Sequence, residues 1–589
     1  MSESHPPVAP AGEPLGGGPA PAQRSSRRGL AVVGAAVAVA VAGGGAYAAW
    51  SFLSTGAQPA EVLPASTLGY VAVDVDPGGA QKIEAFRTLR KFPALQEELG
   101  LDTDDDLREL IVDEFLSGSD CDLSFENDFA PWVGKKLAMA AVPGAGDDEV
   151  TPVIVVEVSD EEAATTGLTA VRECSDDLGW AFQDGFVLVS PTEAQAAAVA
   201  DEVADGSTLA DDEGFSTWVD EAGGGGFVTG YVAPTATPYL LDAFDGLSDL
   251  ASLPGAALPG LGGPATPGIT PENPFADMSD AELEAMGIDP DLVEELYGSD
   301  DGDAGGLGSG GLGGLPGAEE LEERIGEERE QLEEALADFE GAGMSLRFDD
   351  GAARLEAVAG GLGNATDETP AVSDLVGSLP AATGVLIAMS VNGEWAESVT
   401  STLTDLLGEG LVGDIERATG LDLPGDAQTL LGDAVALVID GRFDAREFTN
   451  SFDPSTLPVG LRILGDPDEI GDVVEKLLSS LGADAQLVTV EKGEDGVAVG
   501  LDPAWVASLA EDGDIGDNDR YDDVVSGDGD PASVFFIDFD APWFTSLSEA
   551  LTGGDLPEVD ENLEPLKALG ISSWVDEDQS RLVLELATD

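Results

Sequence analysis

The stretches LPASTLGYVAVDV (residues 63–75) and LPAATGVLIAMSV (379–391) open two parts of the chain in the same way. Each has a proline-led start and then alternates apolar residues, which predicts a β-strand with one buried face. Five further blocks recur in the same order along the chain. We therefore predict an internal duplication, with a first unit over 63–363 and a second over 371–589.

The recurring blocks predict the same local structures in both units. Blocks at 151 and 457 are strands that run into helices through an acidic turn, which suits the positive end of the helix dipole. Strands without an intervening helix also recur, so the pattern favours an α+β fold with largely antiparallel sheets and covering helices; a doubly wound parallel sheet is the alternative. The other paired blocks are 123–142 with 421–440, 185–200 with 496–510, 227–244 with 534–551, and the predicted hairpins 343–360 with 570–589.

The N-terminal region predicts a membrane anchor. Residues 1–28 are rich in Pro, Gly, Ala and Ser, which indicates a disordered tail. Residues 29–53 carry no charge and would span about 37 Å as a helix, enough to cross a bilayer. Arg24, Arg27 and Arg28 precede this span, so we expect a single-pass protein with a cytoplasmic N-terminus and an extracytoplasmic bulk. The alternative is a signal peptide cleaved after the Ala-Tyr-Ala sequence at 46–48.

The first unit is longer than the second because of one insertion, at about 246–341. The insertion begins with a Pro/Gly-rich linker, which is followed by a short helical stretch and then by a Gly-rich linker. Its last part, 317–340, has apolar residues on one helical face and carboxylates elsewhere. This amphipathic helix either packs on its own unit or binds a partner.

Composition excludes several classes of function. The 589 residues include 116 acidic and 24 basic side chains, a net charge of -92 that would repel nucleic acid. The single histidine, His5, lies in the predicted tail, so the folded part has no Ser/His/Asp triad and no histidine-ligated metal. We found no sequence motif for a cofactor and expect none.

The two cysteines suit an oxidising compartment. Cys121 and Cys174 both lie in the part predicted to be exported and have polar neighbours, so we expect a disulfide between them. Two unpaired buried thiols are the alternative.

The densest run of oxygen ligands is a weak candidate for a calcium site. It contains Asp512, Asp514, Asp517 and Asp519. The run departs from the EF-hand pattern, because Gly516 stands at the fifth position and Asp523 rather than glutamate at the twelfth. An acidic loop or helix start is the alternative reading.

Two stretches and the single span carry a family resemblance. YVAVDVDPGGAQKIEAFRTLRKFPAL (70–95) and FENDFAPWVGKKLAMA (125–140) resemble the actinobacterial domain-of-unknown-function 3352 family. The resemblance implies a single-pass cell-envelope protein with no established activity. It offers no catalytic residues to transfer to this chain.

These observations predict a non-enzymatic, membrane-tethered envelope protein whose acidic exterior binds an unknown envelope partner or organises the cell surface. One alternative is a carrier or sensor of an envelope lipid or other apolar ligand, which would need an apolar site in the repeat units. A second is a glycan hydrolase that uses two carboxylates, although close carboxylate pairs arise by chance in so acidic a chain.

The net charge gives a first prediction. Repulsion among carboxylates should destabilise the fold at low ionic strength. Raising the NaCl concentration from 10 mM to 300 mM shortens the screening length about threefold or more, so the melting temperature should rise. Thermal unfolding at both salt concentrations measures this. An unchanged melting temperature would show that the folded chain spaces or pairs its carboxylates.

Overall fold

The computed structural model describes most of the chain after residue 57. The described segments are 58–74, 84–85, 87–88, 90–93, 108–109, 112, 123–146, 149–174, 178–240, 333, 336–349, 351–361, 372–390, 413, 416–451, 453–481, 484–525, 529–552, 562–575 and 579–589. The predicted tail (1–28) and membrane span (29–53) lie outside these residues, as does most of the predicted insertion. Among the described helices, none is both long and apolar enough to cross a membrane.

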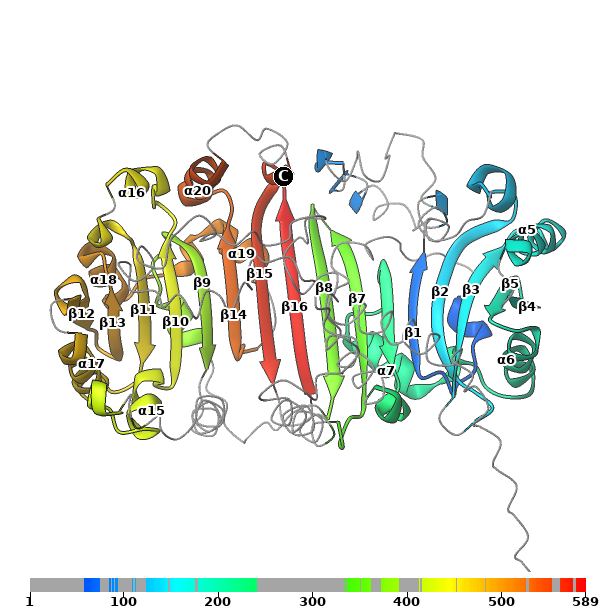
Figure 1. Cartoon of the computed structure of the whole chain (residues 1–589), viewed down its shortest axis with the longest axis horizontal. Helices are drawn as coiled ribbons and strands as arrows, with labels where there is room; N and C mark the ends of the chain where they lie inside the picture. The colour runs from blue at the N-terminus through cyan, green and yellow to red at the C-terminus, as the bar shows by residue number, and fades with distance from the viewer. Residues whose placement is uncertain are drawn as a thin grey trace, which may run out of the picture.

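The described strands form one continuous antiparallel sheet of sixteen strands, which runs the full width of the molecule (Figure 1). This confirms the α+β prediction with a largely antiparallel sheet, and the parallel alternative is wrong. The first eight strands in spatial order are β4 (Gly179–Gln183), β5 (Phe186–Ser190), β3 (Val150–Val158), β2 (Val133–Pro143), β1 (Gly69–Asp74), β6 (Val228–Val232), β7 (Gly341–Asp349) and β8 (Ala352–Gly360).

The sheet continues directly from β8 into the C-terminal part of the chain, because β8 pairs with β16. We predicted a sheet in each unit, and the structure instead joins all the strands in one. The remaining strands in spatial order are β16 (Gln579–Thr588), β15 (Leu566–Val575), β14 (Ser533–Asp538), β9 (Thr383–Ser390), β10 (Ala434–Asp440), β11 (Val459–Leu464), β13 (Gly496–Gly500) and β12 (Thr489–Lys492).

The predicted acidic turns do open helices. Asp160 accepts hydrogen bonds from the backbone N–H groups of Glu162 and Ala163 at the start of α5 (Glu161–Cys174). Asp466 does the same at the start of α17 (Pro467–Leu481). The strand–helix order predicted from 185 and 496 is confirmed by β5 with α6 (Glu193–Asp205) and by β13 with α18 (Pro503–Ala510).

Shorter elements complete the described fold. The α-helices are α7 (Glu213–Glu221), α12 (Ser373–Gly377), α15 (Gly425–Leu431), α16 (Ala445–Ser451), α19 (Asp519–Val524) and α20 (Pro542–Thr552). The other helical turns are η1 (Pro59–Val62), η2 (Phe125–Phe129), η3 (Leu209–Asp211), η4 (Pro234–Ala236), η5 (Pro454–Thr456), η6 (Asp484–Leu487) and η7 (Ile515–Asp517).

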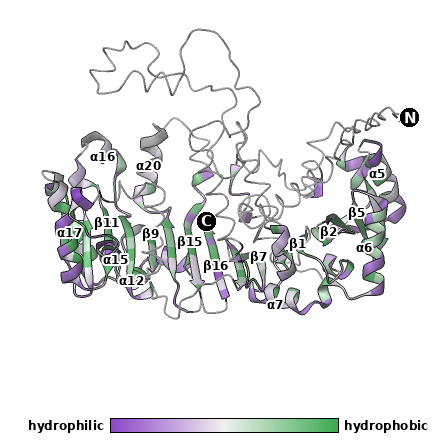
Figure 2. Cartoon of the chain, turned by 60° about the horizontal axis from the view of Figure 1, so that its bottom comes forward, coloured by the Kyte–Doolittle hydropathy of each residue, from purple (hydrophilic) through white to green (hydrophobic). Residues whose placement is uncertain are grey.

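The two faces of the sheet are covered differently. One face, here called the core face, packs against α6 and α7 in the first part and against α12, α18 and α19 in the second, and it holds the two largest apolar clusters. On the opposite face, here called the second face, α5 and α17 pack over the outer strands. Figure 2 shows that the strands between these ends are largely hydrophobic.

Glycines on the core face allow helices to approach the sheet closely. A Cβ added at Gly343 of β7 would lie 2.0 Å from the Trp218 carbonyl oxygen of α7. A Cβ added at Gly570 of β15 would lie 2.1 Å from the Val524 carbonyl oxygen of α19. Neither position can carry a side chain without displacing its helix.

A buried carboxylate sits where β8 meets β16. Glu356 is 1% exposed and forms ion pairs with Arg347 (2.5 Å), Arg354 (3.5 Å) and Arg581. Burial raises its pKa, but the hydrogen bond from Arg581 and the charges of the three arginines lower it more, so the net pKa is below the ordinary value. Glu356 is therefore ionised at neutral pH and links three strands.

Removing this charge should weaken the junction between the strands. Glu356→Gln should lower the free energy of unfolding by about 3 kcal/mol at pH 7, because the arginines lose their buried partner. A carboxylate whose pKa is lowered by folding stabilises the folded state at pH values above its pKa in the unfolded chain. The difference in the free energy of unfolding between the variant and the wild type should therefore shrink as the pH falls below about 4.3. Chemical denaturation between pH 3 and 7 measures both effects.

The matched control is Glu193→Gln, because Glu193 pairs with Arg172 while its side chain stays 71% exposed. This change should cost under about 1 kcal/mol. Equal effects of the two substitutions would contradict the role assigned to Glu356.

Candidate functional site

The second face of the sheet carries a large group of apolar side chains that are not fully buried. The group, here called the apolar patch, spans β11, β10, β9, β14, β15 and β16. Exposed fractions are 40% for Leu461, 37% for Ile387 and Met389, and 41% for Leu582. Its members are Leu461, Leu437, Ile439, Val385, Ile387, Met389, Phe535, Ile537, Leu569, Ile571, Leu582, Leu584 and Leu586.

Strand register aligns part of the patch in a row. The directly paired residues of the patch form a continuous series across six strands, from β11 to β16, without a polar member. Cross-strand neighbours on one face have Cβ atoms about 5 Å apart, so these side chains are in lateral contact range. In order, the row is Leu461, Leu437, Ile387, Phe535, Ile571 and Leu584, and the next residue across the sheet, Leu355 of β8, already packs in the covered cluster that contains Ala85.

The patch offers almost no hydrogen-bonding groups. Its backbone N–H and C=O groups lie in strands that are paired on both sides. Ser533 and Ser573 lie beside it on the same face, and their hydroxyl oxygens are 2.6 Å apart in a mutual hydrogen bond. A molecule lying on the patch would therefore meet hydrocarbon and little else.

The corresponding face in the first part of the sheet is covered by described residues. Ala85, which is fully buried, packs with apolar side chains of β6, β7 and β8. Leu336 and Phe339 pack against Val232 and Ala342. The members of the apolar patch, by contrast, belong to none of the buried clusters found among the described residues.

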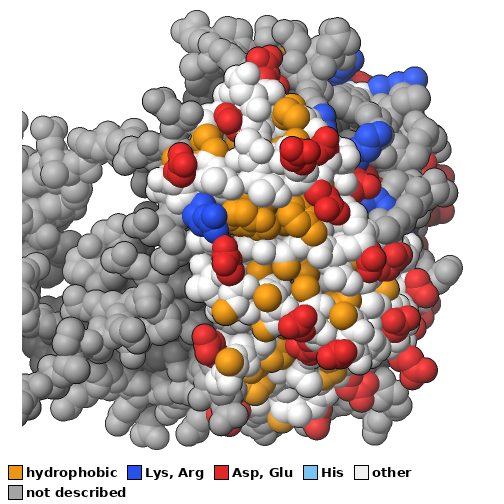
Figure 3. Space-filling model, turned by 90° about the vertical axis from the view of Figure 1, so that its right-hand side faces the viewer, with side chains coloured by type: hydrophobic (Ala, Val, Ile, Leu, Met, Phe, Trp, Pro, Cys, Tyr) orange, Lys and Arg blue, Asp and Glu red, His pale blue; other side chains and the backbone are white. Residues whose placement is uncertain are grey.

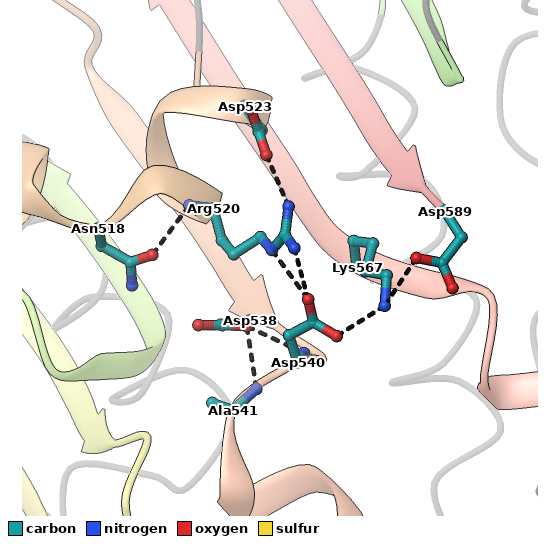
Figure 4. A network of polar contacts seen from close by, with 8 residues as sticks. All are labelled: Asn518, Arg520, Asp523, Asp538, Asp540, Ala541, Lys567 and Asp589. Carbon is teal, nitrogen blue, oxygen red and sulfur yellow. Dashed lines mark hydrogen bonds and ion pairs between the residues drawn. The ribbon is translucent and has the colours of Figure 1, made fainter.

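A polar network lies at the ends of the central strands β14, β15 and β16, near the C-terminus (Figure 4). Asp540 accepts hydrogen bonds from Arg520 of α19 (2.6 Å) and from Lys567 of β15 (2.9 Å). Lys567 also contacts the C-terminal residue Asp589 at 2.9 Å. Burial raises the pKa of Asp540, but the hydrogen bonds and charges of Lys567 and Arg520 outweigh it and lower that pKa. The network ties α19 to the strand ends.

Asp538, next to this network, is the one carboxylate there whose pKa is raised, and burial is the main cause. Its Oδ1 accepts backbone hydrogen bonds from Asp540 (2.9 Å) and Ala541 (3.0 Å). These bonds fix the turn that leads into α20. Asp538 therefore acts as a turn residue.

The four weak calcium candidates do not converge. Asp512, Asp514, Asp517 and Asp519 are all exposed. Asp514 caps η7 through the backbone N–H of Gly516. Within the described segments, no group of three or more His, Cys, Asp or Glu side chains has an arrangement that could hold a metal ion.

The predicted disulfide is not tested by the described residues. Cys174 is the exposed last residue of α5. Cys121 lies outside the described residues. The bond between them stays a prediction.

Comparison with known proteins supports the family resemblance. A family model described as "Protein of unknown function (DUF3352)" matches residues 31–184, from the predicted membrane span to the turn after β4. The predicted resemblance to this family is confirmed. No match to the chain was found among curated proteins or among solved structures. The description of the matching family gives no activity.

The two faces of one strand give a direct test of the patch. Leu386 is fully buried on the core face, and its neighbour Ile387 points to the second face. Leu386→Ala should lower the free energy of unfolding by about 3 kcal/mol, and Ile387→Ala by about 1 kcal/mol or less. Chemical denaturation of both variants measures the difference. Equal losses would show that Ile387 lies in a closed core.

Proposed function

We propose that this protein is a non-enzymatic, membrane-anchored extracytoplasmic binding protein, and that it binds an apolar ligand on the apolar patch. The observation that carries the proposal is the uncharged row of paired apolar residues from Leu461 to Leu584. Leaving such side chains partly in water costs free energy that an apolar ligand would recover. Contiguous apolar patches of this extent commonly mark interaction sites.

An envelope lipid is the ligand we favour, because the predicted anchor keeps the sheet near a bilayer. Five residues separate Leu53, at the end of the predicted span, from Pro59 at the start of η1, so the two ends are at most about 20 Å apart. Ala60, Val62 and Leu63 are buried against the core face of the first strands. A predicted anchor that ends so few residues before the buried η1 supports access to membrane lipids.

The acidic exterior should make binding at the apolar patch selective, because negatively charged molecules and surfaces are repelled. Figure 3 shows acidic side chains spread over the end of the molecule, among apolar and uncharged ones. With a net charge of -92, other copies of the chain and anionic surfaces are repelled. Binding an unknown envelope protein through this exterior remains the alternative proposal.

We also propose that the two parts of the sheet arose by internal duplication. The strand order β4-β5-β3-β2-β1-β6-β7-β8 has the same form as β12-β13-β11-β10-β9-β14-β15-β16. The sequences of the two terminal hairpins can be aligned with Gly343 opposite Gly570. Glu356 is then aligned with Val583, and these two residues are also directly paired between β8 and β16 in the sheet. This supports a two-fold relation through that residue pair. Strand pairing also corrects our sequence alignment of the blocks at 227 and 534 by two residues. Tyr231 of β6 and Phe536 of β14 occupy equivalent positions, because they pair with the equivalent residues Tyr70 and Leu386.

Loss of bound lipid tests the proposed function. The full-length chain, purified in mild detergent from its own type of host, should retain a stoichiometric apolar adduct in native mass spectrometry. The double change Ile387→Asp with Leu584→Asp should reduce that adduct at least tenfold, because it places charges on the patch. Circular dichroism and thermal unfolding check that the variant still folds.

The control variant is Leu487→Asp. Leu487 is 45% exposed but lies on η6, away from the patch. It should keep the adduct at the wild-type level. An adduct that survives unchanged in all variants, or none in the wild type, would contradict the proposed function.

A further inference from the structure

We infer that β16 carries a self-complementary surface that fits a second copy of the same strand, and that β8 takes the place of that copy within this chain. The inference rests on the proposed internal duplication and is independent of the proposed ligand. It draws on the register of the sheet and on the charged side chains at the junction between β8 and β16.

Strand register fixes which residues of the two strands are equivalent. Val358 of β8 pairs with Gly343, and Glu585 of β16 pairs with Gly570, the equivalent glycine. The alternate residues that face the core are therefore, in equivalent order, Arg354, Glu356 and Val358 in β8 and Arg581, Val583 and Glu585 in β16. Both strands have the same arginine, and one glutamate and one valine have exchanged places.

The observed junction satisfies these charges asymmetrically. Arg354 pairs directly with Glu585 across the two strands, and its Nη1 lies 2.8 Å from Oε2 of that carboxylate. The equivalent pairing on the other side of the two-fold relation joins Arg581 to Val358, which offers no carboxylate. Arg581 instead forms an ion pair with Glu356, two residues back along β8. Only one of the two equivalent arginines therefore has a carboxylate directly opposite it.

A second β16 would place a carboxylate opposite both arginines. If a copy of β16 occupied the position of β8 in the same register, Val583 would lie opposite Val583 of the copy, and Arg581 opposite the copy's Glu585. By symmetry this ion pair would form twice, as a repeat of the pair between Arg354 and Glu585. Opposite charges that face each other across two strands stabilise their pairing. The surface of β16 is thus complementary to itself.

A second β8 would not fit β8 in this way. The same register would place Glu356 opposite Glu356 of the copy, and each Arg354 opposite a valine. Directly opposite residues have Cβ atoms about 5 Å apart, and like charges in such positions destabilise a sheet. Glu356 is 1% exposed, so water would screen little of this repulsion. We therefore assign the self-complementary surface to β16 and not to β8.

Covering β16 with a strand of the same chain also avoids the repulsion between two chains. A second copy would bring another net charge of -92 beside the first. β8 is covalently linked to β16 and so competes at a high effective concentration with any second chain. In the intact protein we expect β16 to stay paired with β8 of its own chain.

An exchange of two residues within β8 tests the inference in the full-length chain. Glu356→Val combined with Val358→Glu gives β8 the order of β16, arginine, valine and glutamate, and so builds the pairing of β16 with itself inside one chain. The new glutamate lies opposite Arg581. This double variant should unfold at nearly the wild-type urea concentration. Glu356→Val alone should unfold at a lower one, because three arginines lose their buried carboxylate.

The matched control makes the same exchange in β16. Val583→Glu combined with Glu585→Val gives β16 the order of β8, with the same composition and net charge as the first double variant. It places a second carboxylate opposite Glu356 and removes the carboxylate partner of Arg354. Its unfolding midpoint should fall at least about three times as far as that of the first double variant. Urea denaturation followed by circular dichroism measures all the midpoints.

The two double variants decide the inference between them. A large loss confined to the exchange in β16 supports it. Equal midpoints, or a larger loss from the exchange in β8, would overturn it. None of these results bears on the proposed apolar ligand, because the changed side chains lie on the core face, opposite the apolar patch.

Discussion

Pairing between β8 and β16 is the interaction on which the rest of the structure depends. It joins a sheet that would otherwise end at two exposed edges, and each edge would be open to association with other chains. Glu356 lies in this pairing with three arginines around it. In a chain with so few basic residues, gathering three around one carboxylate makes the junction specific to these two strands.

The junction also determines how the two faces of the sheet differ. Its charged residues lie on the core face, between the places where α7 and α19 contact the sheet at Gly343 and Gly570. The second face carries only apolar side chains at the same point, including Leu355 and Leu584. Because β-strands alternate their side chains, one strand pair can hold both a buried ionic cluster and a continuous apolar surface.

Sequence patterns predicted the local elements well. Alternation, acidic helix starts and the two hairpins identified strands and helices because they depend on neighbouring residues. The continuous sheet could not be predicted, because pairing between β8 and β16 joins residues more than 200 positions apart, such as Arg354 and Glu585. The two-residue error in the block at 534 has the same origin, since only the partners of Phe536 fix its register.

The candidate site was less predictable than the fold. The sequence directed attention to aspartates 512–519, but Asp514 caps η7, and no group among the described residues has an arrangement that could hold a metal ion. The apolar patch was missed because each of its strands is an ordinary alternating strand, and residues such as Ile387 and Leu386 are indistinguishable in hydropathy. A signal did exist in the apolar outer positions of β9, β10 and β16, which in a sheet with one solvated face would be polar.

The difference between the two parts of the second face follows from which segments pack there. In the first part, Ala85, Leu336 and Phe339 cover the apolar side chains of β6, β7 and β8. Keeping Ile387 and Met389 more than a third exposed sacrifices burial energy that a few apolar residues would supply. Among the described residues, no buried cluster includes the side chains of the patch, and this is the observation on which the proposed apolar ligand rests.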